Sequence, residues 1–143
     1  MDVSGISRIL GGRKTLRTEI RDRMDLVELG RRGVSKAALL RLAGFLGLSV
    51  AEIAALLPVG ERTIQRYERS HRFKSNVSEH ILQIAEVAAR GEEVFGEKDR
   101  FLAWLNLPSA ALGNAIPEEL LSSRFGAELV LDELGRIEHG IVV

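Results

Sequence analysis

Apolar side chains recur every three or four residues along most of the chain, which is the spacing of one face of an α-helix. No stretch alternates for long between apolar and polar residues, as a half-buried strand does. The pattern therefore predicts an all-α fold with about seven helices. The expected segments are residues 16–30, 36–47, 50–57, 61–69, 77–90, 97–106 and 126–138, and Pro117 stands at a favourable helix start.

Two neighbouring helices carry clear signals for their ends. Ser35 caps the first of them, and Gly47 stops it. Ser49 and Glu52 then have the spacing of a capping box, which begins the second helix. Pro58 is expected to end that helix after about two turns.

The segment ERTIQRYER, residues 61–69, is expected to form an amphipathic helix. At about 100° per residue its Glu, Arg and Gln side chains share an arc of about 140°, while Thr63, Ile64 and Tyr67 lie opposite. Two short helices, the second with a cationic outer face, indicate a helix-turn-helix, although an ordinary solvated surface helix is the alternative. In a DNA major groove, Arg suits guanine and Gln suits adenine. The candidate DNA-contacting residues are Arg62, Thr63, Gln65, Arg66 and Arg69.

The formal net charge of zero conceals two oppositely charged halves. Residues 1–75 carry 15 Lys and Arg against 8 Asp and Glu, whereas residues 76–143 carry 5 against 12. A basic half is attracted to phosphates, whereas an acidic half is repelled by them. The split therefore favours two different partners. Chance clustering of charges on solvated surfaces is the other interpretation.

Helix pattern and charge together predict three regions. Residues 1–15 contain small residues, two adjacent glycines and a short basic run, and we interpret them as a mobile arm. A helix-turn-helix domain is expected over residues 16–75, followed by a small helical domain over residues 76–143.

The expected helices of the last region each present one apolar face. Gly91 is expected to end the first of these helices, and Trp104 is interpreted as a core residue of the second. A chain this short cannot bury all of these apolar faces against itself. We therefore expect a homodimer. After Gly140 the chain ends in an apolar tail, Ile141-Val142-Val143, which either packs on its own domain or a second copy, or enters a partner.

The sequence offers no motif for catalysis or for a bound cofactor or metal. Cysteine is absent, and the three histidines, His71, His80 and His139, lack the spacing of metal ligands. Neither a G-x-S-x-G motif nor a phosphate-binding loop occurs. Because no apolar run approaches 18 residues and no signal-like segment begins the chain, we expect a cytoplasmic, non-enzymatic protein without membrane contact.

Several stretches resemble known families. LSVAEIAALLPVGERTIQRYER at 48–69 is similar to the Cro/repressor-type helix-turn-helix. The turn in that family usually holds a Gly, whereas this chain has Pro58, which cannot take a positive φ, so the turn is expected to close differently. Together with RTIQR within the same segment, three further stretches resemble the Xre/MbcA/ParS-type antitoxins, and the resemblance covers roughly residues 25–143. These are EVFG at 93–96, FLAWLNLPSAALGNAIPEELL at 101–121 and GAELVLDELGRIEHG at 126–140.

The resemblance implies a two-part helical antitoxin that pairs with a toxin encoded beside it. The common partner in that family is a RES-domain toxin, similar to ADP-ribosyltransferases, which consumes NAD⁺. Family members block the toxin's active site with their C-terminal region and often bind operator DNA to repress their own operon. The implied toxin-binding residues are Arg136, Ile137, Glu138, His139, Gly140, Ile141, Val142 and Val143. A free-standing transcriptional regulator whose C-terminal domain only dimerises, and a partition or scaffold protein, remain as alternatives.

Overall fold

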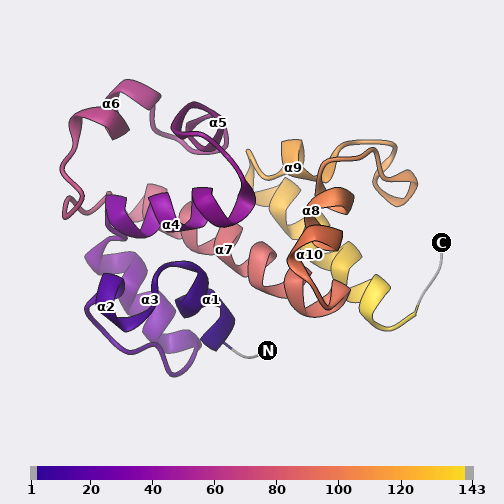
Figure 1. Ribbon diagram of the computed structural model, residues 1–143, viewed down its shortest axis with the longest axis horizontal. Coiled ribbons are helices and arrows are strands. Elements are labelled where there is room, and N and C mark those ends of the chain that lie inside the picture. Colours follow the sequence, from indigo (N-terminus) through magenta and orange to yellow (C-terminus); the bar gives the residue numbers. More distant parts are fainter. Residues whose placement is uncertain (1–2, 141–143) are drawn as a thin grey trace. The chain divides into compact units, whose positions relative to one another are not determined.

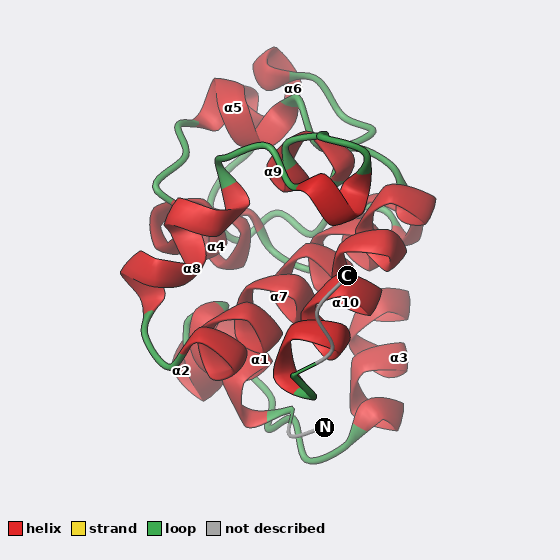
Figure 2. Ribbon diagram, turned by 90° about the vertical axis from the view of Figure 1, so that its right-hand side faces the viewer, coloured by secondary structure: helices red, strands yellow, loops and turns green. Residues whose placement is uncertain are grey.

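A computed structural model describes residues 3–140, and the regular elements in that range are all helices, as Figures 1 and 2 show. The predicted all-α fold is therefore confirmed. None of the described helices is long and apolar enough to cross a membrane. In chain order the helices are α1 (Ser4–Ile9), α2 (Gly12–Leu16), α3 (Arg23–Arg32), α4 (Lys36–Leu46), α5 (Val50–Ala54), α6 (Glu61–Arg66), α7 (Ser75–Phe95), α8 (Lys98–Leu105), the 3₁₀ helix η1 (Ala110–Leu112), α9 (Pro117–Leu120) and α10 (Arg124–Glu138).

The chain divides into two compact units, and the division falls between Glu86 and Val87, inside α7. The boundary predicted after residue 75 lies earlier, because the first half of α7 is bonded into the first unit. The buried Ser78 hydroxyl accepts a hydrogen bond from the Val34 amide (2.8 Å) and donates one to the Phe73 carbonyl (3.0 Å).

Residues 3–15 form α1 and most of α2, and their apolar side chains are buried in the first unit, so the prediction of a mobile arm is wrong for them. Ile6 and Leu10 are fully buried, and the side chain of Leu16 is 3% exposed. Both α1 and α2 contact α4. The two adjacent glycines form the sharp turn between α1 and α2 and are not a loose linker. Gly11 and Gly12 both have positive φ, at 104° and 71°, which only glycine adopts readily.

The helix predicted over residues 16–30 is wrong in its first half, since α3 begins only at Arg23. The Asp22 side chain caps that start by accepting a hydrogen bond from the Asp25 amide (3.1 Å). The predicted apolar stripe is only partly buried. Met24 is 65% and Val27 is 46% exposed, whereas Leu29 is buried.

The predicted starts of the next two helices and the Gly47 stop agree with the structure, but the second helix ends at Ala54, earlier than the end expected at Pro58. The Ser35 hydroxyl accepts from the Ala38 amide, and Gly47 ends α4 with a φ of 70°. The Ser49–Glu52 capping box forms in both directions, at 3.1 and 2.9 Å. The Ser49 amide and hydroxyl hold the pKa of Glu52 below its ordinary value. The stabilisation from this ionised carboxylate is therefore present above the ordinary pKa and is lost as pH falls through the lowered one.

In the second unit, α7 runs straight through Gly91, so the prediction that this glycine ends the helix is wrong. The Phe101 ring on α8 occupies the space where a side chain at position 91 would lie, and it is fully buried there. Gly91 is therefore a packing site, and the helix ends where Gly96 takes a φ of 80°.

Replacing Gly91 by Ala tests this packing. Alanine favours a helix by about 1 kcal/mol over glycine, but its methyl group would overlap a ring that cannot move cheaply. We expect a net loss of about 1–2 kcal/mol in the free energy of unfolding, measured by urea denaturation, and partial recovery when Phe101→Leu is added. Gly135→Ala on α10 is the matched control, because that position has open space and should not lose stability. Equal stability of the two Ala variants would contradict the account.

The last predicted helix is confirmed as α10, which begins two residues earlier than expected. The Ser123 hydroxyl caps it by accepting from the Gly126 amide (2.9 Å). Ala127, Val130 and Leu134 are fully buried along its inner face, as the apolar spacing predicts.

Candidate nucleic-acid and partner interfaces

α5 and α6 form the helix-turn-helix pair and pack through small and branched side chains. Ile53 and Ile64 are fully buried, and Ala54 is 7% exposed. The connecting turn closes through the Leu56 and Leu57 amides, which donate to carbonyls three residues earlier (3.0 Å each). No residue from 48 to 60 has a positive φ, so the exposed Pro58 fits the turn without a left-handed residue. This is the different closure that the sequence predicted.

The outward face of α6 keeps most of the candidate DNA contacts together. Arg62, Gln65 and Arg66 are exposed, whereas Thr63 is half-buried beside the core residue Ile64. The Gln65 amide group donates to the Glu61 carboxylate (3.3 Å), which restrains it on this face. A short helix that presents two Arg and one Gln to solvent has the donors and acceptors that read base edges in a major groove.

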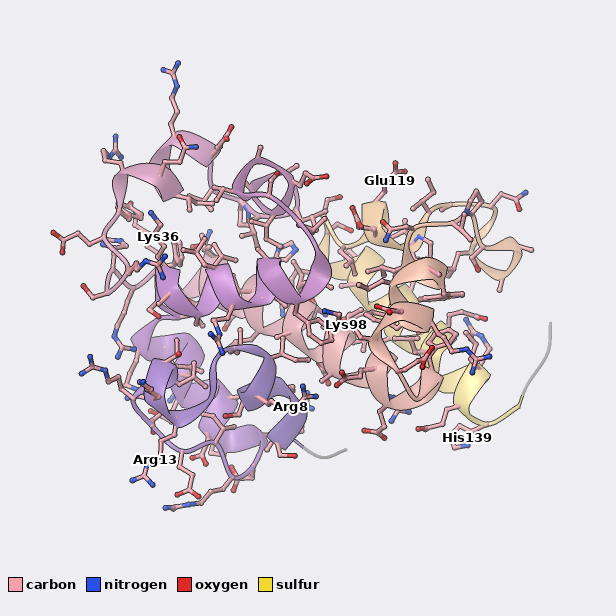
Figure 3. The ribbon with its side chains drawn as sticks, viewed as in Figure 1. Arg8, Arg13, Lys36, Lys98, Glu119 and His139 are labelled. Atoms are coloured by element: carbon pink, nitrogen blue, oxygen red, sulfur yellow. The ribbon has the colours of Figure 1, made fainter. Side chains whose placement is uncertain are left out.

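Arg69 does not lie on this face, which corrects the predicted arc. The helix ends at Arg66, and Tyr67 turns into extended backbone with φ −76° and ψ 147°. At this end, Lys36 Nζ donates to the Tyr67 carbonyl (2.9 Å) and the Gln65 carbonyl (3.4 Å). Figure 3 shows Lys36 at the start of α4, below the end of α6. A cation that binds the last carbonyls of a helix stabilises its termination there.

The segment after α6 pairs with the start of α4 and carries Arg69 away from the reading face. The Arg69, His71 and Val34 carbonyls accept hydrogen bonds from the Ala37, Lys36 and Phe73 amides, each at 2.9 Å. The Tyr67 and His71 rings stack at 3.5 Å within the same segment. Arg69 is thereby fixed beside the N-terminal end of α4.

Lys36→Gln tests the termination of α6. The shorter neutral side chain should lose two charge-assisted hydrogen bonds to carbonyls, each contributing about 1 kcal/mol or more. We expect the Ile64 and Tyr67 amides to exchange with solvent about tenfold faster, as measured by hydrogen exchange. Lys74→Gln, which alters an exposed lysine near the start of α7, should leave both rates unchanged. Unchanged rates in Lys36→Gln would show that the lysine does not hold this helix end.

The candidate partner-binding residues lie at the end of α10 and are partly engaged within their own unit. Arg136 Nε bonds to the buried Glu133 carboxylate (2.8 Å), and Glu138 pairs with Arg90 of α7 (2.7 Å). Ile137 is half-buried and His139 is exposed beside Gly140, which has a φ of 71° (Figure 3 labels His139). Ile141, Val142 and Val143 lie outside the described residues.

The exposed face of α10 carries an apolar pair that the sequence analysis did not single out. Phe125 is 83% and Leu129 is 50% exposed, and Asp132 and Arg136 continue the same stripe. The spacing i, i+4, i+7, i+11 places all four on one side of the helix. Because the expected helix began at residue 126, Phe125 fell outside it and the repeat was missed. This stripe leads directly to the predicted partner-binding residues.

Both units match known protein families, and the matched ranges follow the structural division. Residues 25–86 match the antitoxin Xre-like helix-turn-helix domain. Residues 90–140 match the antitoxin Xre/MbcA/ParS C-terminal toxin-binding domain. The boundary between the two matches falls where α7 passes from one compact unit to the other.

Two curated relatives share moderate identity with the chain. A protein from Yersinia enterocolitica called Antitoxin Xre is 34% identical over 94 residues, which are 64% of this chain and 63% of the relative. A protein of the same name from Photorhabdus laumondii subsp. laumondii is 36% identical over 72 residues, or 50% of this chain and 49% of the relative. The matches thus span less than two thirds of either relative. The chain therefore combines an Xre-like helix-turn-helix domain with a C-terminal domain of the Xre/MbcA/ParS antitoxin type.

Proposed function

We propose that this protein is the antitoxin of a type II toxin–antitoxin pair, in which the second unit binds and neutralises a toxin. The observation that carries the proposal is the match of residues 90–140 to a toxin-binding domain. The first unit, with its Xre-like helix-turn-helix, is assigned to operator DNA. This arrangement also accounts for the basic first half and the acidic second half of the chain.

The toxin-binding surface is proposed to be the exposed stripe of α10 together with the chain end. Phe125 and Leu129 supply an apolar centre, and the stripe reaches the predicted residues from Arg136 onward. A few side chains that become fully buried at the centre of an interface supply most of its binding energy. Acidic residues on the same unit would speed association with a cationic site on the toxin. Steric blocking of the toxin's active site by α10 and the tail is the proposed mechanism.

Co-purification tests the proposal. A full-length tagged chain, co-expressed with the protein encoded by the neighbouring gene, should retain that protein through affinity and size-exclusion steps in 0.5 M salt, since about this concentration screens non-specific charge contacts. A DNA-only regulator would show no such complex, and that result would favour the free-standing regulator with a merely dimerising second unit.

The toxin is proposed to be a RES-domain protein that consumes NAD⁺. The purified partner should deplete NAD⁺, and adding the full chain should stop the depletion at a stoichiometric ratio. A partner that is retained but does not consume NAD⁺ would keep the antitoxin proposal and remove the RES identity.

A homodimer is proposed as the form that binds DNA. A two-fold pair of helix-turn-helix units matches the two half-sites of a palindromic operator. Light scattering of the protein alone at tens of micromolar is expected to give about twice the chain mass of 15.8 kDa. A mass equal to one chain under these conditions would exclude the dimer without toxin.

A further inference from the structure

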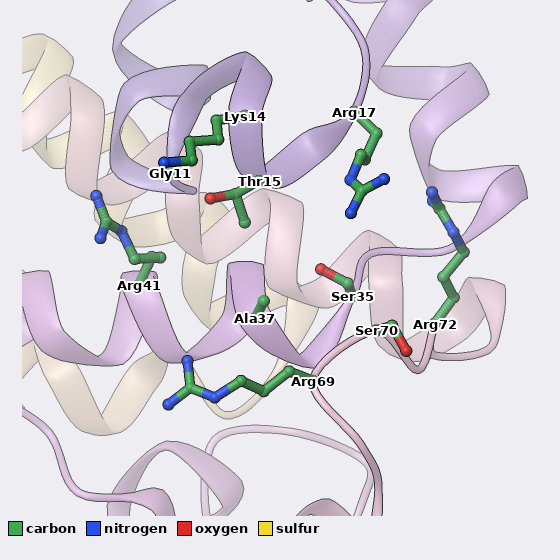
Figure 4. Close-up of a pocket in the computed structure, with 10 residues that line it drawn as sticks. All are labelled: Gly11, Lys14, Thr15, Arg17, Ser35, Ala37, Arg41, Arg69, Ser70 and Arg72. Carbon is green, nitrogen blue, oxygen red and sulfur yellow. The ribbon is translucent and has the colours of Figure 1, made fainter.

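The first unit contains a pocket that the proposed function does not use. It has a volume of about 740 Å³ and is lined by residues of α2, of the start of α4 and of the segment after α6. Figure 4 shows Lys14 and Thr15 on one side of the opening and Arg69 on the other, with Ala37 of α4 between them. The pairing of the segment after α6 with the start of α4 holds two of these walls together.

The described lining is strongly cationic. Its charged members are Lys14, Arg17, Arg41, Arg69 and Arg72, and no acidic residue is among the ten described residues that line the pocket. Arg72 donates to the Gly33 carbonyl (2.9 Å). The side chains of the other four make no hydrogen bond or ion pair with any residue from 3 to 140. Some exposed arginines elsewhere in this unit pair with carboxylates, as Arg23 does with Glu86 and Arg31 with Glu28.

Five like charges around one hollow repel one another, and a cationic set with no acidic residue in the described lining favours an anion. Two features of the backbone near this pocket accompany the cationic side chains. Arg17 occupies the left-handed region with a φ of 60°, at the end of α2, which is uncommon for a residue with a side chain. The positive end of the α4 dipole points to the same place, although its first amides are already bonded. The side chains therefore have to supply the donors.

We propose that this pocket binds phosphate groups. Arg and Lys side chains from separate segments can surround such a group with charge-assisted hydrogen bonds. The ten described lining residues include no aromatic or large apolar side chain on which a base would stack, so the phosphates themselves are recognised. Two sources offer this chemistry, namely the backbone of DNA beyond the bases read by α6 and a free polyphosphate. The site is separate from the α6 face in either case.

Calorimetric titration of the full chain with inorganic tripolyphosphate is the first arm of the test. The double variant Lys14→Gln/Arg41→Gln removes two unpaired charges from the pocket without altering α6. The matched control, Arg13→Gln/Arg32→Gln, removes two exposed charges of the same unit that do not line the pocket, and Figure 3 shows Arg13 pointing outward from α2. The pocket variant should bind at least tenfold more weakly than the control. Its thermal midpoint should not fall, because repulsion is relieved.

The second arm uses random-sequence DNA, which makes it independent of operator reading by α6. If the pocket holds DNA phosphates, the slope of log K against log salt should fall by about two in the pocket variant relative to the control. A lost tripolyphosphate affinity with an unchanged slope would identify a free polyphosphate, whereas a lower slope alone would identify DNA. Equal behaviour of the two variants in both arms, including no measurable binding of tripolyphosphate by any form, would overturn the proposal.

Discussion

Replacing Phe125 by Ala is expected to weaken binding of the toxin thirtyfold or more while leaving the fold intact. The ring is 83% exposed in the free protein, so its removal takes little from the core. Burying a phenylalanine in a partner contributes about 1.5–3 kcal/mol, and central aromatic residues of interfaces reach 2 kcal/mol or more. At about 1.4 kcal/mol per tenfold change, 2 kcal/mol corresponds to about thirtyfold in the dissociation constant.

The measurement is the dissociation constant of the full-length chain with its toxin by isothermal titration calorimetry. Leu107→Ala is the matched control, because Leu107 is 60% exposed in the same unit but lies off α10. The control is expected to bind as the unaltered chain does. A Phe125→Ala variant that binds no more weakly than the control would show that this face of α10 is not the interface.

The tail is tested separately from the helix by ending the chain at Glu138. This cut keeps the ion pair between Glu138 and Arg90, which a deletion from residue 137 would destroy. Loss of neutralisation with unchanged helicity would assign the blocking role to residues 139–143. Full neutralisation by the shortened chain would assign it to the α10 stripe instead.

Arg66→Ala is expected to lower operator affinity by about 1–3 kcal/mol, or roughly 5- to 150-fold, and to relax sequence preference. Arg66 is exposed on the reading face of α6, where it can reach a guanine edge. Arg69→Ala is expected to act differently, because Arg69 lies beyond the helix and lines the cationic pocket. If the pocket holds DNA phosphates, this change should weaken binding to all DNA alike, and with either phosphate source it should leave the ratio of operator to random affinity unchanged.

Gel shifts with promoter DNA and random DNA, at two salt concentrations, separate these cases. Arg13→Ala serves as the charge-matched control on a surface away from α6. Should Arg69→Ala relax the preference as much as Arg66→Ala does, the placement of Arg69 off the reading face would have to be abandoned. No preference of the unaltered chain for its promoter would remove the repressor half of the proposed function.

Local signals predicted the helices whose ends depend on neighbouring residues. Ser35, Gly47 and the Ser49–Glu52 box act within a few positions of the chain, so their spacing alone is enough to find them. The buried anchor Ile64 and the exposed Arg62 follow in the same way from a 3.6-residue period.

Predictions were wrong where a residue distant in sequence decides the outcome. The end of α6 is bonded to Lys36, 31 residues before Tyr67, and local spacing does not reveal this contact, so the arc containing Arg69 looked continuous. Gly91 looked like a helix stop because the Phe101 ring that fills its empty side is invisible to local spacing. The first 15 residues appeared mobile because α1 and α2 are too short for a periodic signal and depend on burial in the first unit.

The central claim, that this chain neutralises a toxin encoded beside its own gene, is tested most directly by bacterial growth. The neighbouring gene is induced alone or with the full-length chain at matched expression, and colony-forming units are counted. Induction alone is expected to arrest growth, and co-expression of the unaltered chain is expected to restore it. Persistent arrest in the presence of well-expressed chain, or no toxicity of the neighbouring protein at all, would contradict the account.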